Sequence, residues 1–144
     1  MNKKGYTLIE IITVFSLIGI LISLSIPKIT NDFGYLDNSL EELLRDVRYI
    51  QTEVMKNPSN SYKISVDSIK HSYYIVNSRN NNKVLKSVKL KNRYTISYNG
   101  NGDLYFNSSG TPINPGTFEI TDTRLNKSKK VTVVVATGRT IIVE

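Results

Sequence analysis

The sequence contains no cysteine and only one histidine among its 144 residues. Without cysteine it can build neither a disulfide framework nor a thiolate metal site. A single histidine, His71, removes most metal-binding and acid–base chemistry. His71 stands beside Ser72 in a strand-like run, so we interpret it as a structural or exposed side chain rather than a catalytic base. A glycine-rich phosphate loop of the Walker kind is also absent, and we expect neither an enzyme nor a cofactor.

Acidic residues are fewer than basic ones, 12 against 19, and the net charge is +7. Lys3 and Lys4 precede the first apolar block and Glu10 lies within it. The part from Lys28 onward therefore holds 17 basic and 11 acidic residues and carries +6. A basic exposed domain suits an acidic partner such as nucleic acid, teichoic acid or anionic lipid, or is simply a solvated surface. The length argues for one domain.

The longest uncharged apolar run covers residues 11–26, directly after Glu10. As a helix, residues 6–26 would be roughly 31 Å long, enough to cross the hydrocarbon core of a bilayer. Lys3 and Lys4 before this segment would keep the N-terminus in the cytoplasm and place the remainder outside. The segment is therefore either a membrane span or a targeting signal.

Two interpretations of this segment need only general rules. In an ordinary secretory signal peptide, Ser23, Leu24 and Ser25 would form the small-x-small cleavage site, but Pro27 lies very close to that cut. In a plain signal anchor the carboxylate of Glu10 would have no purpose. A charge in a membrane helix costs roughly 2.5–3.5 kcal/mol on insertion scales, so Glu10 is expected to have a partner.

A third interpretation comes from the stretch Lys3-Lys4-Gly5-Tyr6-Thr7-Leu8-Ile9-Glu10, which resembles the type IV prepilin signature. The resemblance implies that a prepilin peptidase cuts between Gly5 and Tyr6, and that the new Tyr6 amine is methylated. It also implies that Glu10 pairs with the Tyr6 amine of a neighbouring subunit, which would offset the burial cost of both charges. Tyr6 stands where the family usually has phenylalanine, and it keeps the aromatic bulk.

Gly19 and Pro27 both weaken a helix, glycine by its backbone freedom and proline by removing a hydrogen bond. In pilins a glycine and a proline at similar places bracket a stretch that extends when subunits enter the filament. The resemblance implies this flexible role for Gly19 and Pro27. The alternative is that such residues are simply common in membrane helices.

An amphipathic helix is predicted after a polar break at residues 31–38, which includes Gly34. Asp37 or Ser39 would restart the helix, because Ser39 and Glu42 match a capping box. Apolar residues then recur at helical spacing and need a sheet to pack against: Leu40, Leu43, Leu44, Val47, Ile50 and Val54. Pro58 ends the helix.

After this helix, apolar and polar residues alternate, and this pattern predicts roughly seven antiparallel strands. They are expected at residues 62–66, 72–76, 84–98, 104–106, 117–121, 130–135 and 140–143, with turns at 78–82, 99–103 and 136–139. In the strand at 84–98, Lys89, Lys91 and Arg93 would share one face. The loop at 99–103 lacks the spaced carboxylates of a calcium site, so no metal is expected there.

These patterns predict an α+β fold: a long N-terminal helix, membrane-spanning in its first half and amphipathic in its second, packed on an antiparallel β-sheet domain. The expected parts are a leader at residues 1–5, a hydrophobic helix at 6–27, an amphipathic helix at 28–58 and a β-rich exposed domain at 59–144.

The exposed domain resembles a narrower family, the minor pseudopilins H, at residues 44–49, 106–111, 116–118 and 137–141. The resemblance implies a structural subunit of a pilus, competence or type II secretion machine. Such a subunit is first a single-pass protein of the cytoplasmic membrane and then part of a cell-surface filament. Its implied partners are other pilin or pseudopilin subunits, prepilin peptidase, an inner-membrane assembly platform and membrane lipid.

A DNA-binding module that aids DNA uptake or adhesion is the alternative function. Lys89, Lys91 and Arg93 are candidate contacts to a phosphate backbone, unless they only keep an edge strand soluble. Some related minor pilins bind DNA through a Gly-Arg-x-Arg stretch near the C-terminus. Here residues 138–141 keep the first arginine, Arg139, and lack the second.

Overall fold

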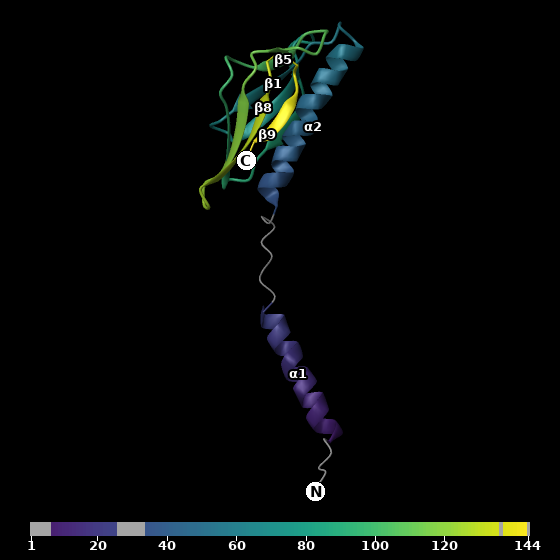
Figure 1. Cartoon of the computed structure of the whole chain (residues 1–144), viewed down its shortest axis with the longest axis vertical. Helices are drawn as coiled ribbons and strands as arrows, with labels where there is room; N and C mark the ends of the chain where they lie inside the picture. The colour runs from purple at the N-terminus through teal and green to yellow at the C-terminus, as the bar shows by residue number, and fades with distance from the viewer. Residues whose placement is uncertain (1–6, 26–33, 136, 144) are drawn as a thin grey trace. The chain divides into compact units, whose positions relative to one another are not determined.

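The structure is a computed structural model of the 144-residue chain, and it describes residues 7–25, 34–135 and 137–143. The chain divides into two units, Met1–Phe33 and Gly34–Glu144. The first contains helix α1. The second, called the globular unit below, contains helix α2 and strands β1 to β9 (Figure 1).

Helix α1 covers Leu8–Ser25, and all of its side chains up to residue 23 are exposed. The hydroxyls of Thr13 and Ser16 donate to carbonyls of the preceding turn, so these polar groups are satisfied within the helix. Gly19 lies inside α1. No helix among the described residues is long and apolar enough to cross a membrane. The predicted cleavage site at Gly5 and Tyr6, and Pro27, lie outside the described residues.

Helix α2 covers Tyr35–Lys56. It starts directly after Gly34, which has a left-handed backbone (φ 74°) and makes no side-chain cap. The predicted capping box was therefore wrong, since Ser39 lies inside the helix and is buried. The helix starts earlier because Tyr35 and Leu36 pack against the core, which extends its apolar face by one turn.

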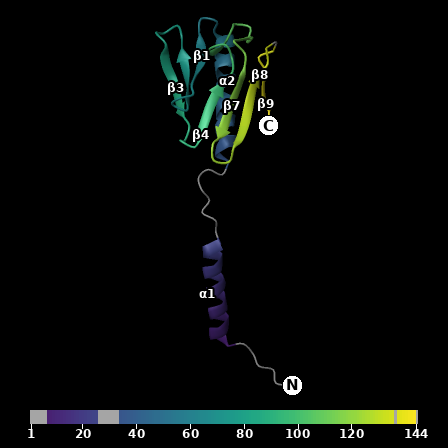
Figure 2. The ribbon, with the colours of Figure 1, turned by 90° about the vertical axis from the view of Figure 1, so that its left-hand side faces the viewer.

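The strands form two antiparallel sheets. Their bounds are β1 Tyr62–Asp67, β2 Ser72–Asn77, β3 Lys83–Lys89, β4 Tyr94–Tyr98, β5 Leu104–Phe106, β6 Pro112–Ile113, β7 Thr117–Asp122, β8 Lys127–Val133 and β9 Thr140–Val143. One sheet has the order β3-β2-β1-β5-β6 and the other the order β4-β7-β8-β9. Figure 2 shows β3 and β9 at opposite sides of the globular unit, with α2 behind the sheets.

The predicted strand at residues 84–98 was wrong, because it is two strands in different sheets. The chain leaves the first sheet after β3, and Leu90 is buried where the chain crosses. A turn follows, in which the Tyr94 amide donates to the Lys91 carbonyl (2.8 Å). The apolar alternation continues through the crossing because Leu90 belongs to the same core as β4.

The core lies between α2 and the two sheets. Its largest fully buried side chains include Tyr73, Tyr94 and Phe118, and α2 contributes Leu40, Leu43, Val47 and Ile50. The predicted α+β fold, a helix packed on antiparallel sheet, is confirmed. His71 is not in a strand. It occupies the turn before β2 with a positive φ of 50°, and its buried Nδ1 has no hydrogen-bond partner among the described residues.

Candidate functional site

Glu10 lies in the first turn of α1, and its side chain is exposed. Together with Ile11, Val14 and Phe15 it lines a small hollow of about 300 Å³ on the helix surface. A carboxylate is favourable near the N-terminus of a helix, where the helix dipole is positive. This surface therefore offers a partner one negative charge surrounded by apolar side chains.

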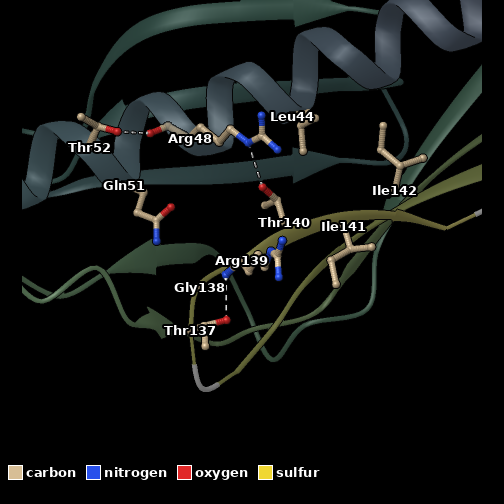
Figure 3. Close-up of a pocket in the computed structure, with 10 residues that line it drawn as sticks. All are labelled: Leu44, Arg48, Gln51, Thr52, Thr137, Gly138, Arg139, Thr140, Ile141 and Ile142. Atoms are coloured by element: carbon tan, nitrogen blue, oxygen red, sulfur yellow. Dashed lines mark hydrogen bonds between the residues drawn. The ribbon is translucent and has the colours of Figure 1, made fainter.

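The globular unit carries a second candidate, an open groove of about 900 Å³ between α2 and the C-terminal segment. Leu44, Arg48, Gln51 and Thr52 form its α2 wall, and residues 137–142 form the opposite wall (Figure 3). The α2 residues share one side of the helix because they are spaced by three or four positions. We call this feature the α2–β9 groove.

Arg48 makes one hydrogen bond across the groove with its side chain and accepts one within α2 with its backbone carbonyl. Its Nε donates to Thr140 Oγ1 (3.2 Å), and its carbonyl accepts from the hydroxyl of Thr52 (2.8 Å). Thr140 is buried, so one end of this contact is fixed in the protein. Figure 3 shows Arg48 and Arg139 reaching the groove from opposite walls, α2 and the C-terminal segment.

Gly138 and Gln51 fix the turn that precedes β9. Gln51 Nε2 donates to the Gly110 carbonyl (2.8 Å), and Gly138 packs against both groups with φ +62°. The Gly138 amide donates to the Val134 carbonyl, and the Val134 amide donates to the Arg139 carbonyl, both at 2.9 Å. Two of the segments that resemble minor pseudopilins H, 106–111 and 137–141, thus meet around Gln51. The turn before β9 places Arg139 in the lining of the groove.

The groove has a one-sided charge. Its lining contains the guanidinium groups of Arg48 and Arg139, and no aspartate or glutamate occurs among the described residues that line it. Arginine presents a planar fork of donors that matches a carboxylate or a phosphate. The groove therefore offers two guanidinium groups beside an apolar surface, which Leu44, Ile141 and Ile142 supply.

The structure does not bring the predicted DNA contacts together. Lys89 is exposed at the end of β3, whereas the Lys91 ammonium lies 4.5 Å from the centre of the Tyr35 ring. Arg93 donates through Nε to Asp122 (2.7 Å), and a second guanidinium nitrogen bonds the other carboxylate oxygen. The prediction that these three side chains share one face of a single strand was therefore wrong, since β3 ends at Lys89 and β4 begins at Tyr94, while their contact with DNA stays a prediction. Arg139 directly precedes β9, and Figure 2 shows β9 and β3 at opposite sides of the globular unit.

Arg48 and Gln51 were not identified from the sequence as site residues. The available signal was weak: they are polar residues next to the apolar face of a predicted helix, a position that is usually only solvated. The pairing of this helix side with residues 137–142, about ninety positions later, comes from the fold. Within the described part of the chain, no group of three metal-ligating side chains occurs.

Residues 1–26 match the family model described as the prokaryotic N-terminal methylation motif. No curated protein matches the chain. Two solved structures share its fold, both of the minor pseudopilin EpsH from the type 2 secretion system of Vibrio cholerae. Each has a TM-score of 0.62 and 13% identity, and they cover 75% and 76% of this chain and 95% and 93% of their own.

At 13% identity, the similarity to these two structures establishes the fold alone. The family model is separate evidence, and it establishes an N-terminal methylation motif at residues 1–26. This chain therefore carries a match to the prokaryotic N-terminal methylation motif at residues 1–26, followed by a globular unit that shares the fold of the minor pseudopilin EpsH.

Proposed function

We propose that this chain is a minor structural subunit of a type IV pilus-like filament, cleaved between Gly5 and Tyr6 and methylated on Tyr6. The observation that carries the proposal is the presence, in one chain, of the methylation motif at residues 1–26 and a pseudopilin-like globular unit. A motif alone could precede many domains, and a fold alone could serve many functions. Their combination is specific to filament subunits and favours a non-enzymatic role.

Assembly would use the exposed surface of α1. This helix presents apolar side chains to its surroundings over its described length, and apolar area of this extent requires a partner. In the proposed filament the partners are the same helices of neighbouring subunits. Glu10 would pair with the methylated Tyr6 amine of a neighbour, so that two opposite charges share one apolar environment and set the axial register.

Before assembly, the precursor would be stored in the cytoplasmic membrane with its N-terminus inside. This part of the proposal rests on the methylation motif and on the two lysines before the apolar segment. It requires prepilin peptidase to remove the leader at residues 1–5 and an inner-membrane platform to add the subunit to the filament. Gly19 and Pro27 would supply the flexibility needed during that step.

The machine is proposed at the level of its class: a pilus, competence or type II secretion-like filament. Both structural relatives are minor pseudopilins of a type 2 secretion system, which favours a minor rather than a major subunit. DNA binding stays a prediction: Lys89, Lys91 and Arg93 do not share one strand, because β3 ends at Lys89 and β4 begins at Tyr94.

The test is the intact mass of the chain recovered from membranes of cells that contain an active prepilin peptidase. We expect a chain that begins at Tyr6 and carries one methyl group. Gly5→Val should block cleavage, whereas Glu10→Gln should be cleaved normally but be absent from sheared filaments. A chain that begins at Met1 beside an active peptidase, or at Ile26, would overturn the proposal.

A further inference from the structure

Strand β9 is an edge strand with one free side. It is the last strand of the β4-β7-β8-β9 sheet, and among the described residues it pairs with β8 alone, in the register Val131 to Ile142 and Val133 to Thr140. The Val134 amide donates to the Arg139 carbonyl, so the backbone of Arg139 points toward β8. Because antiparallel strands alternate, the backbone groups of Thr140 and Ile142 point away from β8, toward the free side.

The free side of β9 carries neither the lysine nor the proline that normally protects a sheet edge. Exposed edge strands are usually blunted by lysine, by proline, by shortness or by a covering element. Strand β3 carries three lysines, β6 is two residues long and contains a proline, and β4 contacts β1 of the other sheet. Strand β9 reads Thr-Ile-Ile-Val, with no charge, and its last three residues are all more than 40% exposed.

The α2–β9 groove runs beside this edge, since Thr140, Ile141 and Ile142 belong to its lining. An occupant of the groove would therefore meet a sheet edge on one side and α2 on the other. It would also meet two guanidinium groups, Arg48 and Arg139, with no carboxylate among the described lining residues. The edge requires an extended backbone, and the arginines require an anion.

We propose that the α2–β9 groove receives an extended, acidic segment of a neighbouring subunit, which adds to β9 as a further strand and places a carboxylate on Arg48 and Arg139. The identification of the neighbour as a filament subunit rests on the proposed function. Strand addition of this kind draws its affinity from backbone hydrogen bonds and its specificity from side-chain contacts. The four residues of β9 would pair with about 13 Å of the added strand.

A nucleic acid backbone fits the same groove less well. Thr140 and Ile142 each present an N–H donor and a C=O acceptor toward the free side. A peptide backbone satisfies both kinds of group in alternation, whereas phosphate oxygens only accept. The exposed apolar side chains of Ile141 and Ile142 likewise suit the alternating side chains of a strand.

The test uses the full-length chain in detergent micelles and a fluorescein-labelled peptide of alternating valine and threonine with one central glutamate. The control peptide carries lysine in place of glutamate. We expect the glutamate peptide to bind at least about tenfold more tightly than the lysine peptide, because only the former complements the arginines. Binding should protect the amides of Thr140 and Ile142 from hydrogen exchange.

Three variants separate the contribution of the arginine charges from that of the backbone hydrogen bonds of β9. Arg48→Gln with Arg139→Gln should weaken the glutamate peptide about tenfold and remove the preference over lysine. Ile142→Pro removes one outward N–H and should weaken both peptides, as proline is tolerated on edge strands. Arg45→Gln is the matched control: this arginine is on α2 and exposed, pairs with Glu41, and does not line the groove.

No binding of the glutamate peptide to the native chain would overturn the proposal, as would equal binding of both peptides or protection outside β9. Binding of a duplex oligonucleotide that depends on Arg48 and Arg139 and displaces the peptide would also overturn it, in favour of phosphate recognition. None of these results requires a filament. The proposal can therefore fail while cleavage at Gly5 succeeds, and the two failures are distinguishable.

Discussion

Replacing Gly138 with alanine should destabilise the globular unit and disturb the position of Arg139. Gly138 has φ +62°, a conformation that costs an L-residue roughly 1–2 kcal/mol. An added Cβ would also lie well inside 3.0 Å of Gln51 Nε2 and of the Gly110 carbonyl oxygen. Overpacking of this kind costs about 1–3 kcal/mol, since the carbonyl belongs to the backbone and cannot move alone. We therefore expect the free energy of unfolding to fall by about 2–4 kcal/mol.

Two other glycines with positive φ separate the backbone cost from the steric cost. At Gly34, φ is +74° and the nearest atom to an added Cβ is 4.0 Å away, so Gly34→Ala reports the backbone term alone. It should cost about 1 kcal/mol, because alanine also lowers the entropy of the unfolded chain. At Gly110, φ is +76° and the close atom is the sulfur of Met55 (2.6 Å), a flexible and half-exposed side chain. Gly110→Ala should therefore fall between the other two.

Urea unfolding of the full-length chain in micelles, followed by far-UV circular dichroism, measures these differences. With a slope of about 1–3 kcal/mol per molar urea, Gly138→Ala should lower the midpoint by roughly 1–2 M, and Gly34→Ala by less than half as much. Equal midpoints for the two variants would refute the reasoning. They would mean that the turn before β9 yields freely and that Gln51 does not fix it.

Two further predictions concern groups that join distant elements. Tyr73→Phe removes a buried hydroxyl that donates to Asp46 (2.7 Å) and should cost about 1–2 kcal/mol. Asp46→Ala leaves that hydroxyl without its acceptor and removes one of the two carboxylates that pair with Lys86, the other being Glu42, so it should cost about 2–4 kcal/mol. Equal urea midpoints for the two variants would contradict this. The hydrogen bonds from Arg93 lower the pKa of Asp122 below its ordinary 3.8, so the stabilisation from Asp122 is complete above that value and is lost as the pH falls through the lowered pKa. Asp122→Asn should therefore flatten the dependence of the urea midpoint on pH between about pH 2 and 5, and an unchanged dependence would exclude this carboxylate as its source.

The features that the sequence predicted well are those that depend on neighbouring positions. The methylation motif is read by an enzyme as a linear segment, so residues 1–26 carry it in full. The apolar face of α2 follows from helical spacing, and Leu40, Leu43 and Val47 are buried as expected. Most strands follow from alternation in the same way.

The errors arose where tertiary contacts decide a local choice. Ser39 and Glu42 match the sequence pattern of a capping box. The side chains of Tyr35 and Leu36 pack on the core, however, so α2 already starts at Tyr35. The alternation across Leu90 continues although the chain changes sheet there, because both sheets face one core. His71 itself occupies the turn before β2 with a positive φ, whereas its position beside Ser72 in the sequence had suggested a strand.

The α2–β9 groove could not be predicted, because the sequence does not show whether a given basic side chain is neutralised by a carboxylate from a distant part of the chain. In the globular unit the aspartates largely serve as cross-links: Asp46 holds Lys86, Asp122 holds Arg93, and Asp103 holds Lys63. Each of these pairs joins elements that are remote in the chain and is therefore invisible to local charge patterns.

A count of basic residues consequently overstates the surface that is available to an anionic partner. In the predicted strip of Lys89, Lys91 and Arg93, for example, the arginine is already bound to a buried aspartate, Asp122. Arg48 and Arg139 differ, because the described residues around them offer a threonine hydroxyl, backbone and apolar side chains but no carboxylate. Two guanidinium groups beside an unprotected strand edge leave both charge and backbone hydrogen bonds to be completed from outside the chain. A neighbouring protein strand completes both at once, and for that reason we place the partner there rather than on the lysines.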